Sequence, residues 1–191
     1  MRPIVPALCI VAVAAIAFGV AAEAAGAATK VKRYQAWTPE GDPIVGKFIE
    51  RRGECNSSSY ATGRSDAWRC FAASNILDPC FENPVHGREV MCVRSPWARN
   101  GTLLASRLDP SDRFPIKAGP WYLVIRGGLR CGFVGGATTV VQGFRLNYVC
   151  GPRGPYLFGK PIRTRPTWRV RMSRNPNGPR LRRVAIRVAW R

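Results

Sequence analysis

Residues 167–191, TWRVRMSRNPNGPRLRRVAIRVAWR, carry the clearest structural pattern of the chain. Apolar and charged side chains alternate on both sides of the central SRNPNGP, and a period of two is typical of a β-strand with one buried face. The pattern predicts a hairpin whose inward side chains are Trp168, Val170, Met172, Val184, Ile186, Val188 and Trp190. The outward side chains, which form a basic face, are Arg169, Arg171, Arg183, Arg187 and Arg191, flanked by Arg163, Arg165, Arg180 and Arg182.

The loop of this hairpin can be predicted from the same alternation. A slip of one residue would set inward side chains against outward ones, so the two strands must pair even positions with even positions. We therefore expect a loop of odd length and not a two-residue turn at Asn177-Gly178. Any such register also places at least one arginine directly opposite another, which costs stability.

Short runs rich in Val, Ile, Trp, Tyr and Phe recur between Gly, Pro, Asn and Asp along the rest of the chain. They predict an all-β fold, a single small disulfide-stabilised sandwich or barrel of short antiparallel strands. A second hairpin is expected around Gly127-Gly128 as a two-residue turn. In that register Val124 lies opposite Cys131 and Tyr122 lies opposite Phe133.

The chain divides into three parts. Residues 1–28 combine an early arginine, an apolar run and a small-residue tail, and they are interpreted as a cleaved signal peptide in preference to a retained membrane anchor. Residues 29–43 contain Pro and Gly and are expected to form a poorly packed N-terminal arm. Residues 44–191 are expected to form the disulfide-stapled β domain, with a strongly basic C-terminal half.

Six cysteines follow the leader: Cys55, Cys70, Cys80, Cys92, Cys131 and Cys150. An even number behind an export signal indicates a disulfide framework, for which 15 connectivities exist. Sequential pairing closes the shortest loops and is preferred, and each bond would stabilise the fold by about 3 kcal/mol. Asp78-Pro79 is expected to turn the chain within this cysteine-rich region.

Charge is distributed unevenly. Residues 29–112 contain 12 Lys and Arg and 10 Asp and Glu, whereas residues 113–191 contain 17 Lys and Arg and no acidic residue. Such asymmetry favours an anionic polymer or a membrane surface as the partner. Arginine outnumbers lysine 25 to 5, which a GC-rich genome would also produce without selection for binding.

No catalytic or metal site is predicted, and no cofactor. The cysteine gaps are too long for a zinc site, and the lone histidine, His86, lies in a segment that reads as a surface loop. Four carboxylates close to the cysteines could form a pair for glycoside hydrolysis: Asp66, Asp78, Glu82 and Glu89. Among the tryptophans, Trp121, Trp168 and Trp190 are expected in the core, and Trp97, beside Arg94 and Arg99, is the best candidate for an exposed stacking platform.

Several motifs resemble a family of secreted actinobacterial proteins of uncharacterised activity. The resemblance rests on Gly53, Cys55, Asp66–Cys70, Asn75-Ile76 and Asp78–Phe81, and then on Cys131, Gly136–Thr138, Gly143, Arg145, Asn147-Tyr148, Cys150 and Trp168. It implies an exported protein with paired cysteines. It implies no catalytic or ligand-binding residue, and the C-terminal arginine excess departs from the family pattern.

Together these features favour a secreted or envelope-associated protein that binds and does not catalyse. The basic face would contact an anionic polymer or surface and give a salt-dependent affinity. Two alternatives remain open at this point: an extracytoplasmic hydrolase that uses the carboxylates near Cys70–Cys92, and a structural domain whose partner is another protein.

Overall fold

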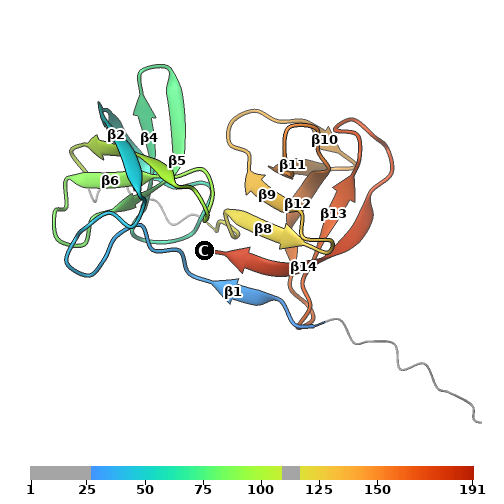
Figure 1. The fold of residues 1–191 in the computed structure, drawn as a ribbon. Helices are drawn as coiled ribbons and strands as arrows, with labels where there is room; N and C mark the ends of the chain where they lie inside the picture. Colours follow the sequence, from blue (N-terminus) through green and yellow to red (C-terminus); the bar gives the residue numbers. More distant parts are fainter. Residues whose placement is uncertain (1–26, 109–116) are drawn as a thin grey trace, which may run out of the picture.

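A computed structural model describes residues 27–108 and 117–191 (Figure 1). Within these ranges the chain forms fourteen strands and no helix, which confirms the all-β prediction. Accordingly, the described ranges contain no helix of the length and apolar character that a membrane crossing requires. The expected signal peptide lies outside the described residues except for Ala27 and Ala28.

The first of two sheets, called here the first lobe, has the strand order β2-β7-β6-β5-β4-β3. Its strands are β2 (Lys47–Arg52), β3 (Glu54–Ser58), β4 (Ala67–Ala72), β5 (Asn75–Glu82), β6 (Glu89–Cys92) and β7 (Asn100–Ala105). Only Gly53 separates β2 from β3, although these strands lie at opposite edges of the sheet. The bend draws the edges together, and it requires glycine, because a Cβ atom at Gly53 would lie 2.6 Å from the carbonyl oxygen of Phe71.

The second sheet, called here the barrel lobe, has the order β1-β14-β13-β12-β11-β9-β8, and β14 also pairs with β8. Six strands therefore close into a barrel. The strands of this lobe are β1 (Lys30–Lys32), β8 (Tyr122–Ile125), β9 (Arg130–Phe133), β10 (Val140–Val141), β11 (Phe144–Val149), β12 (Tyr156–Ile162), β13 (Arg169–Ser173) and β14 (Arg182–Trp190). Its interior is apolar, with Leu123, Leu157 and Ile186 fully buried.

The C-terminal hairpin has the predicted odd-length loop. Val170 lies opposite Val184, and Arg171 lies directly opposite Arg183, as the alternation requires. The expected inward orientation of Val188 and Trp190 is wrong, because a bulge between Ile186 and Val188 reverses the alternation. Beyond the bulge Ala189 is the buried residue, and Val188 and Trp190 are half-buried.

The register predicted for the glycine hairpin is wrong by one residue. Leu123, and not Val124, lies opposite Cys131, and both Leu123 and Cys131 are fully buried. The N–H of Ile125 donates a hydrogen bond to the Leu129 carbonyl oxygen, which leaves a three-residue loop at 126–128. The register that buries Leu123 in the barrel interior is therefore preferred to the register that would give the shortest turn.

Residues 29–43 are packed, which corrects the expectation of a poorly packed arm. β1 pairs in parallel with the Val188–Trp190 part of β14, and the buried side chains that follow it are Tyr34, Ala36 and Trp37. The indole Nε1 of Trp37 donates a hydrogen bond to the carbonyl oxygen of Phe81 in the first lobe. Apolar side chains among the Pro and Gly residues of this stretch provide the packing.

The preferred disulfide pairing is confirmed: Cys55–Cys70, Cys80–Cys92 and Cys131–Cys150 are bonded. The predicted turn at Asp78-Pro79 is wrong, because both residues lie inside β5. The register of β4 and β5 shifts there, so that Asp78 and Pro79 stand opposite the single residue Arg69. A bulge accommodates proline because no ladder N–H is needed at that position.

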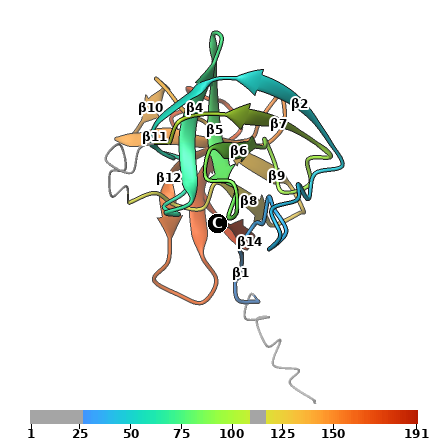
Figure 2. The same ribbon diagram turned by 90° about the vertical axis from the view of Figure 1, so that its left-hand side faces the viewer.

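The two lobes lie side by side in Figure 1, and in Figure 2 the first lobe lies in front of the barrel lobe. They share an aromatic core. The ring of Trp121, which precedes β8, lies 5.8 Å from Phe81 of the first lobe and 5.5 Å from Tyr34, measured between ring centroids. Trp97 of the first lobe contacts Trp190 and Tyr122 of the barrel lobe at 5.6 and 5.5 Å. The lobes are therefore packed against each other through large rings.

Candidate polyanion-binding surface

The barrel lobe is free of carboxylate side chains. Residues 117–191 contain 16 Lys and Arg and no Asp or Glu, and β1 adds Lys30 and Lys32. In the described parts of the chain, the ion pairs join Asp66 of the first lobe to Arg33 and Arg64. The positive charge of the barrel strands therefore has no acidic side chain of its own lobe beside it.

Three of the predicted basic-face residues come together on the outer surface of β13 and β14. Arg171 and Arg183 are direct cross-strand neighbours, and Arg169 follows on the same face two residues before Arg171. Arg169 and Arg183 are exposed. Arg171 is half-buried, and its guanidinium carbon lies 3.6 Å from the centroid of the Phe144 ring. We call these three residues the arginine triad.

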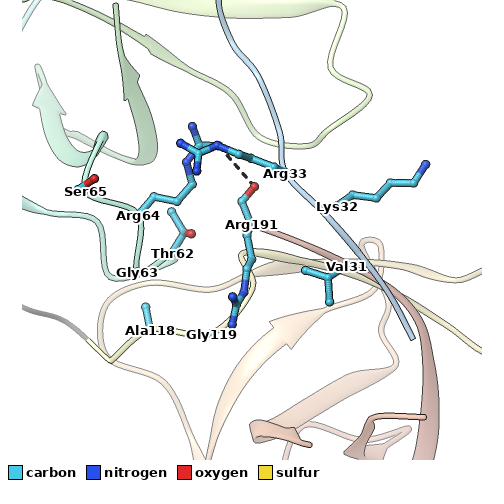
Figure 3. A pocket seen from close by; sticks show the side chains of 10 residues that line it. All are labelled: Val31, Lys32, Arg33, Thr62, Gly63, Arg64, Ser65, Ala118, Gly119 and Arg191. Atoms are coloured by element: carbon cyan, nitrogen blue, oxygen red, sulfur yellow. Dashed lines mark hydrogen bonds between the residues drawn. The ribbon is translucent and has the colours of Figure 1, made fainter. Parts of the chain in front are cut away.

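Arg187 and Arg191 do not belong to the triad. Arg187 is exposed and lies within the register shift of β14. Arg191 lies about 26 Å along the strand from Arg183, at 3.3 Å per residue. It lines a cavity of about 570 Å³ between the lobes, beside Arg33 and Arg64, where Arg64 Nη1 donates a hydrogen bond to the Arg191 carbonyl oxygen at 3.4 Å (Figure 3).

Next to the triad, a cleft of about 630 Å³ opens between the two lobes. We call it the interlobe cleft. Its cations are Arg69 from β4, Lys117, Arg145 from β11 and Lys160 from β12, and its rings include Tyr60 and Phe144. Since Arg171 covers the Phe144 ring, the triad and the cleft are continuous.

The four carboxylates considered for hydrolysis each have a partner. Burial opposes ionisation of Asp66, but hydrogen bonding to Arg64 and its charge prevail and lower the pKa of that carboxyl. Trp68 Nε1 donates to Glu82 Oε2 at 3.0 Å, and Asn83 Nδ2 donates to Glu89 Oε2 at 3.0 Å. Asp66 and Glu82 line one hollow of about 610 Å³, which Asp78 and Glu89 do not line.

Among the described carboxylates, Asp78 has the largest shift in pKa. Burial raises its pKa to about 6, although it accepts hydrogen bonds from the Ser59 hydroxyl and from the backbone N–H of Tyr60. These bonds join β5 to the segment after β3. Asp78 therefore holds two segments of the first lobe together.

The remaining candidate residues, His86, Trp97 and the cysteines, make contacts that serve the fold. His86 lies in an exposed turn, where its backbone N–H donates to Asn83 Oδ1. Trp97 is 39 % exposed, but its ring packs against Tyr122 and Trp190, and the guanidinium carbon of Arg130 lies 4.2 Å from its centroid. The Sγ atoms of Cys70, Cys80 and Cys92 lie within 4.8 Å of one another, but all three are engaged in disulfide bonds.

Sequence reasoning missed the cations of the interlobe cleft. Arg69, Lys117, Arg145 and Lys160 come from different strands and loops of two lobes, and they share no spacing or alternation in the sequence. Comparisons with protein-family models, curated proteins and solved structures found no match for this chain.

Proposed function

We propose that this protein is a secreted, non-catalytic binding protein that contacts an anionic polymer through the arginine triad of the barrel lobe. The three disulfides fit an oxidising compartment, and residues 1–28 would direct export. The resemblance to secreted actinobacterial proteins supports the same location.

The observation that carries the proposal is the direct opposition of Arg171 and Arg183 in a lobe without carboxylate side chains. Like charges opposed across strands destabilise a sheet. A bound polyanion would relieve this repulsion, and its release of counterions would contribute to the affinity.

The shape of the basic surface favours a polymer over a membrane. The cations continue from the outer face of β13 and β14 around Arg171 into the interlobe cleft. A flexible chain can follow this path, whereas a planar bilayer cannot enter a cleft between two lobes.

The proposal is tested by binding the purified, oxidised protein to polygalacturonate at 50 and 200 mM salt. We expect the affinity to fall steeply with salt. Replacing the triad (Arg169→Gln, Arg171→Gln, Arg183→Gln) should weaken binding about tenfold and flatten the salt dependence.

A variant with the same change of charge in the first lobe serves as the control: Lys47→Gln, Arg51→Gln and Arg52→Gln in the exposed strand β2. It should bind nearly as tightly as the unchanged protein. If both triple variants lost the same affinity, net charge alone would explain binding, and a specific binding surface would be refuted. Binding to anionic lipid vesicles but to no soluble polymer would assign the surface to a membrane instead.

A further inference from the structure

The interlobe cleft combines charge and rings from both lobes. Tyr60 and Arg69 come from the first lobe, and Phe144, Arg145 and Lys160 come from the barrel lobe. Its volume of about 630 Å³ lies within the range of pockets that bind small ligands. The cleft therefore has the size of a site for a discrete ligand unit, unlike the open triad surface.

Two cations of the cleft, Arg145 and Lys160, are held by neutral partners. Arg145 donates to Asn147 Oδ1 at 2.8 Å and to the carbonyl oxygens of Val134 and Gly136 at 3.2 and 2.7 Å. Lys160 Nζ donates to the Lys117 carbonyl oxygen at 2.6 Å. No described residue that lines the cleft carries a carboxylate side chain. The charges of Arg145 and Lys160 are thus fixed in position beside neutral groups, whereas Arg69 also interacts with the buried carboxyl of Asp78. The surplus of positive charge favours an anionic ligand.

The rings of the cleft hold guanidinium groups. The Arg69 guanidinium carbon lies 4.9 Å from the centroid of Tyr60 and 4.8 Å from that of Phe71. Arg171 covers one face of Phe144 in the same way. Single-stranded nucleic acids are bound by stacking bases on ring faces, and here guanidinium groups already lie over Tyr60, Phe133 and Phe144. This arrangement favours an anionic group on a saturated backbone over a nucleobase.

Glycine residues keep the cleft open. Gly135, Gly136 and Gly143 line it, and a Cβ atom built on any of them would meet no heavy atom within 4 Å. A ligand can therefore approach the backbone at one side of the cleft while it contacts Arg69 and Tyr60 at the other.

We propose that the interlobe cleft binds an acidic sugar unit of a polysaccharide, with the anionic group at Arg69, Arg145 and Lys160 and the sugar ring beside Tyr60. This inference rests on the proposed function, because it names the class of polymer and the place where one repeat unit is held. The arginine triad would bind the adjoining part of the same chain.

The test uses trigalacturonate, a linear trimer of a uronic acid, titrated into the oxidised protein by calorimetry. We expect saturable binding of one trimer, no binding of the neutral trimer maltotriose, and at least tenfold weaker binding of the oligonucleotide (dT)6. Equal or tighter binding of (dT)6 would overturn the assignment to a sugar, and binding of maltotriose would overturn the role of charge.

A bulky substitution inside the cleft distinguishes binding in the cleft from binding at the triad. Gly135→Trp places a large ring in open space, and Gly135 lacks a left-handed backbone, so we expect folding to persist and trimer binding to be lost. Gly46→Trp is the matched control and should bind normally: Gly46 is an exposed glycine of the first lobe, and a Cβ atom there would make an ordinary contact 3.8 Å from the Arg99 carbonyl oxygen. Unchanged trimer affinity in Gly135→Trp would refute the cleft as the site.

Charge variants complete the assignment. Arg69→Gln and Lys160→Gln should each weaken trimer binding at least fivefold. The double variant Arg169→Gln with Arg183→Gln, which keeps Arg171 on the Phe144 ring, should leave it within twofold. If trimer binding follows the cleft while the triad variant keeps full polymer affinity, the proposed function fails and the cleft stands. If polymer binding follows the triad and the trimer never binds, the cleft assignment fails and the proposed function stands.

Discussion

At the scale of single residues, Asp78 couples the stability of the first lobe to pH. Its pKa is about 6 in the folded protein, above its ordinary value of 3.8, because burial disfavours the charged form. Between these two values the folded protein holds a proton that the unfolded chain releases. The stabilisation by Asp78 is therefore complete below about pH 4 and is lost as the pH rises through 6.

The Asp78→Asn variant should remove this dependence. We expect the free energy of unfolding of the unchanged protein to fall by about 1–3 kcal/mol more than that of Asp78→Asn between pH 4 and pH 7. Urea unfolding at both pH values measures the difference.

Asp42→Asn, the same substitution at an exposed position, is the control for this measurement. Asp66 does not interfere, since its pKa is lowered and its contribution is lost only as the pH falls below its ordinary range. Parallel pH profiles for the unchanged protein and Asp78→Asn would contradict the role of burial.

At the scale of the strand pair, the opposed Arg171 and Arg183 lower the stability of the sheet and are proposed to raise its affinity for a polyanion. Arg183→Glu replaces a repulsive cross-strand pair by an attractive one, so we expect the free energy of unfolding to rise by about 0.5–1 kcal/mol. Affinity for polygalacturonate should fall at least tenfold in the same variant. Urea unfolding and the salt-dependent binding assay give the two values.

Arg52→Glu in β2 is the control, because Arg52 pairs with the neutral residue Ala105. It should change neither stability nor affinity by a comparable amount. A loss of stability in Arg183→Glu would show that the opposed arginines do not repel each other in the folded sheet.

The strand pairs also show what the sequence can predict. The alternation around Val170 and Val184 was strong enough to fix the register and the odd loop of the C-terminal hairpin. It failed where one extra residue enters a strand, beyond Ile186 in β14 and at Asp78-Pro79 in β5. A bulge depends on the partner strand, and the partner is not encoded in local alternation.

At the scale of the whole molecule, the shared aromatic core makes the two lobes one cooperative unit. Trp121 is 1 % exposed and contacts rings from outside the barrel, and its Nε1 has no hydrogen-bond partner in the described structure. Its contribution is therefore one of packing. We expect Trp121→Ala to cost about 3–5 kcal/mol and to separate unfolding into two transitions.

Differential scanning calorimetry tests this through the ratio of the calorimetric to the van't Hoff enthalpy. Leu157→Ala, which opens the barrel interior alone, should cost about 2–5 kcal/mol and keep a single transition. A single transition in Trp121→Ala would mean that the lobes are coupled by other contacts.

The candidate site was only partly predictable from the sequence, because part of it forms between the two lobes. The triad could be identified because its three arginines follow one strand period on neighbouring strands. The cleft could not, because Arg69 and Arg145 meet only through the docking of one lobe on the other. The sequence pattern within each lobe does not predict how the two lobes pack against each other.

The pairing of β14 imposes an order of events on a chain made from its N-terminus. β1, β8 and β13 all find their hydrogen-bonding partner in Arg182–Trp190, so none of these pairings can form until that strand exists. The strands of the first lobe, β2 to β7, pair only among themselves and are complete by Ala105. Of the described strands the arginine-rich β14 is thus made last, and its pairing both closes the barrel and sets Arg183 opposite Arg171.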